Sequence, residues 1–383
     1  MPVNFSDEQI SNYDDKKNKN VEKKESLMDK INNFLLRFSR VPLKEKLFFV
    51  QHLKVMLHAG ISLSKAIKTL SLQADNKYFQ KILTDIGNKI EKGNSFSNSL
   101  APYHDVFGEM FISMIEAGEI SGKLEEVLNQ LFIQMKKEHK LMSKVKGALT
   151  YPTVIMVVMF VIGVFMFVVI VPRITAMFSE MKAELPLPTK VLISISNALA
   201  NNGLLSLVIF ILVVATFIKI IKTPKGKYLF QATLLKTPVI SPIIKKINLA
   251  RFSRNVSSLL QTDIPIIKTF QITAKVLGNL HYRQALNDMS KKIKEGGKIS
   301  DVINSYPKLF TPVVAQMVAV GEETGELDNI LLELAEFYEE EVDLIMENLP
   351  SIIEPLLILV LGLGVGGVAV AIIMPMYSLT SAV

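Results

Sequence analysis

The sequence predicts an all-α membrane protein built from two repeated cytoplasmic helical-bundle modules, of about six helices each, and three transmembrane helices. Three observations predict this class: a high apolar content, three long apolar stretches and an internal repeat. The 383 residues are 49 % hydrophobic and 21 % charged, and their mean hydropathy is +0.33. Soluble proteins of this length are rarely so apolar, so we expect membrane spans that alternate with polar domains.

The N-terminal part of the chain precedes both modules. Residues 1–26 are polar and mixed in charge, which predicts a disordered arm. Residues 27–42 are predicted to form an amphipathic helix. Its apolar face consists of Leu27, Ile31, Phe34, Leu35 and Phe38. Such a face suits either packing on the first module or lying on a membrane surface, and packing is the favoured interpretation.

An internal repeat organises most of the chain. Adding 203 to a residue number between 49 and 172 gives its counterpart between 252 and 375, without a gap. The matched pairs include Leu57 with Leu260, Ser97 with Ser300, Tyr103 with Tyr306, and Met114 with Met317. A register kept through polar and apolar stretches alike predicts two copies of one unit. Each unit holds one cytoplasmic module, 43–147 or 223–350, followed by one apolar span.

The most similar stretches of the two copies are short turn motifs, which read GEISGKL from Gly118 and GEETGEL from Gly321. Glycine permits a positive φ, a hydroxyl can cap the next helix, and a glutamate is favoured beside a helix N-terminus. A structural role is the favoured interpretation, and a contact of the glutamate with a partner or a cation is the alternative. The motif residues are Gly118, Glu119, Ser121, Gly122, Gly321, Glu322, Thr324 and Gly325.

Three apolar stretches are long enough to cross a hydrocarbon core, which takes roughly 20 helical residues. The predicted transmembrane helices are 148–172, 203–222 and 351–374, of which the second is the shortest. Lysines cluster before the first span and after the second, so both modules are expected on the cytoplasmic side. Residues 173–202 are then an extracytoplasmic loop, and residues 375–383 form an extracytoplasmic tail.

The third span carries small residues at a spacing that lets another helix approach closely. Two small-xxx-small pairs occur there, Gly362 with Gly366 and Gly367 with Ala371. They fit packing against another span of the same chain. They fit equally well association with another copy or with the apolar helix of a partner.

The two modules differ in charge at matched positions before their spans. The first reads KKEHKLMSKVK from Lys136, and the second reads EEEVDLIMENL from Glu339. A solvated face is the default interpretation of such runs. Opposite charges could also pair within one chain or between chains, or offer a partner an oriented docking surface. The candidate partner-binding residues are Lys136, Lys137, Lys140, Glu339, Glu340 and Glu341.

Several kinds of chemistry have no motif in the sequence. The chain has no Cys, so thiolate metal sites and Cys nucleophiles are excluded. Residues 296–300 lack the glycine and hydroxyl of a phosphate loop, the five His form no HExxH pair, and no G-x-S-x-G motif occurs. We therefore expect no enzyme activity, no cofactor and no catalytic or metal site. The net charge of +7 is better explained by membrane topology than by nucleic acid.

Several motifs together resemble the GspF/PilC family, the inner-membrane platform proteins of type II secretion and type IV pilus assembly systems. They are the segments 47–67 and 234–260, both turn motifs, and two pairs that open the first and third spans. These pairs are Tyr151 with Pro152 and Glu354 with Pro355. The resemblance runs from about residue 43 to the end. A glycine usual in the family is present as Gly60 but is replaced by Asp263 in the second copy, where Asp can adopt left-handed geometry or cap a helix.

The resemblance implies a multi-pass protein of the bacterial inner membrane with both modules in the cytoplasm. It implies a non-enzymatic platform that couples a cytoplasmic assembly ATPase to the polymerisation of pilin or pseudopilin subunits. Other inner-membrane assembly proteins and further copies of the chain are the remaining expected partners. A transporter or channel component is the alternative, and it rests on the one ionisable residue inside a predicted span, Glu354.

Overall fold

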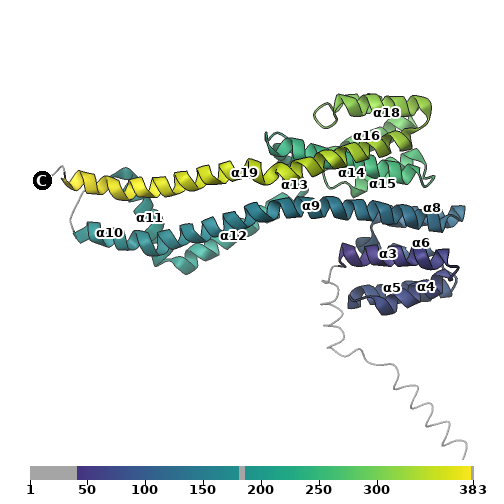
Figure 1. Ribbon diagram of the computed structural model, residues 1–383, viewed down its shortest axis with the longest axis horizontal. Helices are drawn as coiled ribbons and strands as arrows, with labels where there is room; N and C mark the ends of the chain where they lie inside the picture. Colours follow the sequence, from purple (N-terminus) through teal and green to yellow (C-terminus); the bar gives the residue numbers. More distant parts are fainter. Residues whose placement is uncertain (1–40, 181–185, 381–383) are drawn as a thin grey trace, which may run out of the picture. The chain divides into compact units, whose positions relative to one another are not determined.

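The structure, a computed structural model, describes residues 41–180 and 186–380. The predicted arm and all but the last two residues of the predicted amphipathic helix lie outside these ranges. Within them every regular element is helical and no strand occurs. The chain divides into two compact units, Met1–Phe132 and Ile133–Val383. The long helix α9 begins in the first unit and continues in the second (Figure 1).

The first unit contains the helices of the first module and the start of α9. Their bounds are α3 (Leu43–His58), α4 (Leu63–Gln73), α5 (Lys77–Glu91), α6 (Phe96–Leu100), the 3₁₀ helix η1 (Ala101–Tyr103), α7 (His104–Phe107), α8 (Glu109–Ser121) and α9 (Leu124–Phe165).

The second unit contains the apolar helices and the second module. Their bounds are the π-helix η2 (Met166–Ile170), α10 (Val171–Glu180), α11 (Leu187–Asn201), α12 (Gly203–Lys222), α13 (Pro224–Leu234), α14 (Ile240–Leu260), α15 (Ile266–Val276), α16 (Leu280–Lys294), α17 (Ile299–Asn304), α18 (Pro312–Thr324) and α19 (Leu327–Thr380).

The two modules repeat one order of helices at the predicted offset. Helices α3, α4, α5, α6, α8 and α9 correspond to α14, α15, α16, α17, α18 and α19. The local signals repeat too, since Asn76 and Asn279 accept hydrogen bonds from the first turns of α5 and α16. Gly60 and its replacement Asp263 both have positive φ, 77° and 59°, so Asp263 adopts the left-handed geometry that the sequence permits.

Each module buries one face of every long helix in a small core. In the first module the aromatic rings of Phe49, Phe79 and Phe107 meet with centroids about 6 Å apart. In the second, the centroid of the Phe310 ring lies 5.5 Å from those of Phe252 and Tyr282, and the buried Tyr282 hydroxyl donates to the Leu309 carbonyl at 2.6 Å. Each core holds its module together as a folded body. In the second module, α14 packs along α19.

Two helical segments are long and apolar enough to cross a membrane, Leu124–Ala176 and Leu327–Ala371. The first contains the first predicted span, and the second covers residues 351–371 of the third. The second predicted span corresponds to α12, a 20-residue helix whose described apolar side chains are largely exposed. Among the described residues α12 is not one of the two segments, so a third transmembrane helix stays a prediction.

The connection between the first two predicted spans differs from the expected loop. It continues as α10 and then forms α11, which packs beside η2 and α19. The Ser196 hydroxyl donates to the Phe167 carbonyl, and the Thr189 hydroxyl donates to the Ala371 carbonyl, both at 2.6 Å. Isolated charges and prolines suggest a loop here, but the apolar residues between them follow helical spacing and form α11, on which Thr189 and Ser196 are buried.

Candidate functional site

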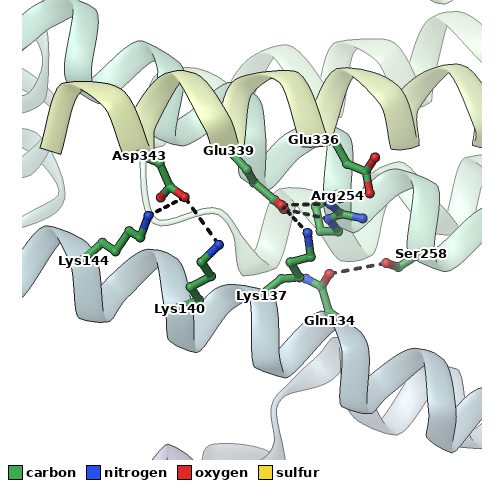
Figure 2. A network of polar contacts seen from close by, with 9 residues as sticks. All are labelled: Gln134, Lys137, Lys140, Lys144, Arg254, Ser258, Glu336, Glu339 and Asp343. Atoms are coloured by element: carbon green, nitrogen blue, oxygen red, sulfur yellow. Dashed lines mark hydrogen bonds and ion pairs between the residues drawn. The ribbon is translucent and has the colours of Figure 1, made fainter. Parts of the chain in front are cut away.

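The oppositely charged runs predicted from the sequence meet inside the second unit, where α9 lies beside α14 and α19 (Figure 2). Glu339 of α19 is the centre of this contact. Its two carboxylate oxygens accept from Arg254 Nε at 2.8 Å and Arg254 Nη2 at 2.9 Å, and Lys137 Nζ donates at 3.0 Å. The Arg254 side chain is 6 % exposed and that of Glu339 16 %, so the pair is shielded from water.

Asp343, one turn further along α19, receives two lysines of α9. Lys140 Nζ lies 3.4 Å and Lys144 Nζ 2.6 Å from Asp343 Oδ2 (Figure 2). Lys144 also lies 3.8 Å from Glu347. The Lys140 side chain is 62 % exposed, so its pair contributes little to stability, about 0–1 kcal/mol. We call Lys137, Lys140, Lys144, Arg254, Glu339 and Asp343 together the charged seam.

Two further ion pairs flank the charged seam. Arg251 of α14 forms a two-pronged pair with Glu138 of α9, and Lys246 of α14 pairs with Glu341 of α19. Helix α14 therefore contacts both long helices with cationic side chains.

A polar layer continues the contact between α9 and α14. The Gln134 amide donates to Asn255 Oδ1 at 2.5 Å, and its oxygen accepts from the Ser258 hydroxyl at 3.3 Å. All three residues are buried. Ser253 and Ser257 are also buried in α14, and their hydroxyls have no hydrogen-bond partner in the described part of the chain. Small side chains let neighbouring helices approach closely here.

An apolar strip extends the contact toward the apolar segments of both long helices. Leu141 of α9 packs with Val342, Met346 and Leu349 of α19, and Val145 borders them. Lys144 and its counterpart Glu347 contact each other across this strip, as do Lys140 and Asp343, so the two helices run parallel and in register. The arrangement can hold α9 and α19 together at the entrance to their apolar segments, but it has no group poised for bond chemistry.

The turn glutamates perform matched structural roles in the two modules. Glu119 of α8 accepts from the backbone N–H of Phe96 and, at 2.8 Å and 2.6 Å, from the N–H and hydroxyl of Ser97. Glu322 of α18 accepts from Ile299 N–H at 2.5 Å, and from the N–H and hydroxyl of Ser300 at 3.0 Å and 2.7 Å. Each carboxylate therefore satisfies the first N–H groups of a short helix, α6 or α17, that precedes it in the chain.

The other residues of the turn motifs end helices or allow helices to pack closely. Gly122 and Gly325 have φ of 72° and 77° directly after α8 and α18. Gly118 and Gly321 are buried, and a Cβ on either would meet Val127 or Leu327 at about 3 Å, so both allow close helix packing. Ser121 does not cap the next helix, because its hydroxyl donates back to the Ala117 carbonyl. Thr324 donates back in the same way and also accepts weakly from Glu326 N–H at 3.4 Å.

The repeated modules and the apolar segments that follow them match a known family twice. Type II secretion system (T2SS) protein F matches residues 49–172 and again residues 252–375. This chain belongs to that family. The two matches have the register of the internal repeat, and they confirm the resemblance predicted from the turn motifs and the span-opening pairs.

Named relatives cover most of the chain. The type IV pilus assembly protein PilC of Myxococcus xanthus is 33 % identical over 90 % of this chain and 83 % of its own length. PilC of Thermus thermophilus is 33 % identical over 88 % of this chain and 83 % of its own. The type II secretion system protein F of Aeromonas hydrophila is 26 % identical over 92 % of this chain and 90 % of its own.

The structure brings together only some of the six charged residues proposed for partners. Lys137 pairs with Glu339, Lys140 with Asp343, and Glu341 with Lys246 of α14. Lys136 and Glu340 lie at the exposed edge of their helices. Of the interpretations open for the charge contrast, pairing within one chain is the one seen here. Arg254, the most buried cation of the charged seam, was missed because a lone Arg in a polar helix gives no signal in sequence.

The residues predicted at the membrane edge and in the third span belong to the two long helices. Pro152 lies inside α9 and is buried, whereas Tyr151, Glu354 and Pro355 are exposed. Gly362, Gly366 and Gly367 are also exposed, and a Cβ on any of them would meet no atom within 4 Å. Ala371 is buried and accepts from Thr189 of α11. Within the described residues, no group of three or more His, Asp or Glu is placed to hold a metal ion.

The repeat pairs Tyr103 with Tyr306, but the bond that each of them makes to an aspartate was not predicted. The Tyr103 hydroxyl donates to Asp85 at 2.7 Å, and the Tyr306 hydroxyl donates to Asp288 at 2.5 Å. Burial and the bond to Asp288 raise the pKa of Tyr306 to about 12. Asp85 and Asp288 differ by the same 203 residues as Tyr103 and Tyr306. This equal offset is the only sign of the two bonds in the sequence, and it is recognisable only once the bonds are known.

We predict that Tyr306→Phe lowers stability by about 1 kcal/mol, because it leaves Asp288 without this donor. A folded-state pKa above the ordinary value means that this stabilisation is complete at neutral pH and is lost as pH rises through about 12. Thermal unfolding of the purified full chain, followed by circular dichroism, measures the loss. Tyr306→Phe and the matched Tyr103→Phe should behave alike, and an unchanged midpoint in both would contradict the prediction.

Proposed function

We propose that this chain is a non-enzymatic inner-membrane platform that couples a cytoplasmic assembly ATPase to the polymerisation of pilin-like subunits. The observation that carries the proposal is the double family match, in which each copy includes both a helical module and the apolar segment after it. The relatives are named as pilus assembly or type II secretion proteins. Pilin or pseudopilin subunits, other inner-membrane assembly proteins and further copies of the chain are its proposed partners.

In the proposed topology, three spans cross the membrane. Both modules lie in the cytoplasm, and the C-terminal tail lies outside. Lysines before the first span and after the second support it. Helix α12 supplies the second span, which returns the chain to the cytoplasm between the modules. Single cysteines introduced into this Cys-free chain test the topology: one near Lys190 should react with a membrane-impermeant maleimide in intact cells, and one near Lys225 should not.

The proposed coupling uses α9 and α19 as rigid connections between the modules and their apolar segments. Movement of a module would then move its span. A Gly-Gly-Ser insertion after Met142 interrupts α9 beside the charged seam and should break this connection. The module upstream of the insertion keeps its core, because its buried residues on α9 end before Met142.

The test is complementation of a deletion strain. We expect loss of surface filaments or of pseudopilus-dependent secretion in the deletion strain while the ATPase and pilin proteins are still made. The wild-type gene should restore assembly, and the Gly-Gly-Ser variant, produced at the same level in the membrane, should not. Normal filaments in the deletion strain would refute the platform function. Solute flux through the purified protein in liposomes would instead support the transporter alternative.

A further inference from the structure

The second unit contains a contact between α9 and α14, and the chain carries a counterpart of each of these helices. Under the offset of 203, α3 is the counterpart of α14 and α19 is the counterpart of α9. On α14, the side that α9 covers is buried: Arg254 is 5 % exposed, Asn255 4 % and Ser258 1 %. The repeat therefore provides corresponding surfaces for a second contact of this kind, on an α3 and an α19.

The receiving side of that second contact is open. The counterparts of the covered α14 residues form the α3 face, which consists of Phe48, Gln51, His52 and Val55. Phe48 is 44 % exposed and Val55 56 %, although both are apolar. The Phe48 ring lies against the His52 ring with centroids 3.8 Å apart, which gives the α3 face a flat aromatic surface.

The incoming side is open as well. On α9, Gln134 points into the formed contact, and Leu141 borders it while packing against α19; they are 8 % and 6 % exposed. Their counterparts on α19, Phe337 and Leu344, are 51 % and 56 % exposed. These two residues are seven apart and so share one side of the helix, which we call the α19 face.

The chemistry of the two open faces changes together. In the formed contact, the Gln134 amide bonds to Asn255 and Ser258. At the same positions of the second contact, Gln134 becomes Phe337 and Ser258 becomes Val55. Asn255 becomes His52, which is also polar, so one polar pair across the contact is replaced by an apolar pair. Such a joint change fits two surfaces that bind each other, because a ring facing hydroxyls or amides would leave those groups unsatisfied.

We propose that the α19 face of one copy docks on the α3 face of a second copy and repeats between chains the contact that α9 and α14 make within one. The binding partner is a second copy of the chain, because α19 of that copy carries apolar side chains that match the exposed apolar side chains of the α3 face. Two different surfaces meet in this contact, so it is heterologous, and successive copies form a closed ring or an open array. The inference names the surface for the self-association in the proposed function and rests on that part of it.

The absence of cysteine from the natural sequence allows a direct test. Two full-length chains with different tags are co-expressed, one carrying Val55→Cys and the other Phe337→Cys. Each chain then has a single cysteine, so any cross-link in native membranes joins two copies. We expect a cross-linked dimer that carries both tags with a short bis-maleimide. The filament assay is a separate measurement, so the contact and the platform function can each fail alone.

Two controls define the result. Leu72→Cys on α4, an exposed apolar site outside the α3 face, replaces Val55→Cys and should give little dimer with Phe337→Cys. Gln134→Cys with Ser258→Cys in one chain should form the internal link and shows that the protein is folded. No mixed dimer while the internal link forms, or as much dimer with Leu72→Cys, overturns the proposal.

A disruptive variant gives a second measurement. Val55→Asp places a charge in the centre of the proposed contact and should weaken the self-association of full-length protein in nanodiscs at least about tenfold. Because Val55 is exposed in the single chain, folding should be unaffected, which circular dichroism checks. Unchanged self-association of the folded variant also overturns the proposal.

Discussion

Replacing Arg254 by Met should lower the stability of the full chain by roughly 3–5 kcal/mol, the largest effect we expect from a single polar substitution here. The substitution leaves the Glu339 carboxylate shielded from water, with Lys137 as its remaining cation. A shielded charge that loses its main partner keeps its desolvation cost without the compensating attraction. Urea unfolding in detergent, followed by circular dichroism, measures the change.

The double variant Arg254→Met with Glu339→Met separates the charge effect from packing. It removes both members of the shielded pair, and Lys137, whose side chain is 37 % exposed, can turn to water. We expect most of the lost stability to return. Lys140→Met is the matched control, because its ion pair is largely exposed and should cost less than about 1 kcal/mol. An Arg254→Met variant as stable as Lys140→Met would show that the charged seam is open in solution.

Replacing Glu322 by Ala should cost roughly 1.5–3 kcal/mol, since hydrogen bonds to a charged acceptor contribute about that much. The change removes the acceptor of two backbone N–H groups and the Ser300 hydroxyl, which begin α17. Without it, α17 and the end of α16 should exchange their amide hydrogens faster. Hydrogen exchange with mass spectrometry on the full chain can locate this effect.

The neighbouring residue supplies the control. Glu323 is exposed and only approaches Lys298 at 3.5 Å, so Glu323→Ala should change stability little. Glu119→Ala should reproduce the effect of Glu322→Ala in the first module, with faster exchange confined to α6 and its surroundings. If Glu322→Ala and Glu323→Ala give the same exchange pattern, the capping role is wrong.

Much of the fold follows from sequence because the signals are local or repeated. Helical spacing predicts the helices, and the constant offset predicts which helices correspond. The left-handed position was also predictable, since Asp263 replaces Gly60 in the same turn. The helix α11 was not predicted, because prolines and isolated charges near Lys190 suggest a loop. Packing against α19 stabilises the helix instead.

The site was predictable in its residue types but not in its pairing. Opposite runs at Lys136 and Glu339 are plain in sequence, yet charge alone cannot say whether they meet in one chain or in two. The roles of Arg254 and Glu119 depend on side chains brought together by the fold. Glu119 binds Ser97, more than twenty residues earlier, and no spacing rule for a single helix would connect them.

The in-register pairing of α9 and α19 has a consequence for the origin of the chain. Lys140 lies opposite Asp343 and Lys144 opposite Glu347, so each residue faces its own counterpart in the other copy. In a self-paired ancestor with one module, these positions would set identical charges against each other, which is unfavourable. Gene duplication followed by fusion removes that restriction, because the two copies can then acquire opposite signs. The present electrostatic match therefore requires two distinct copies of the module, and this chain encodes both.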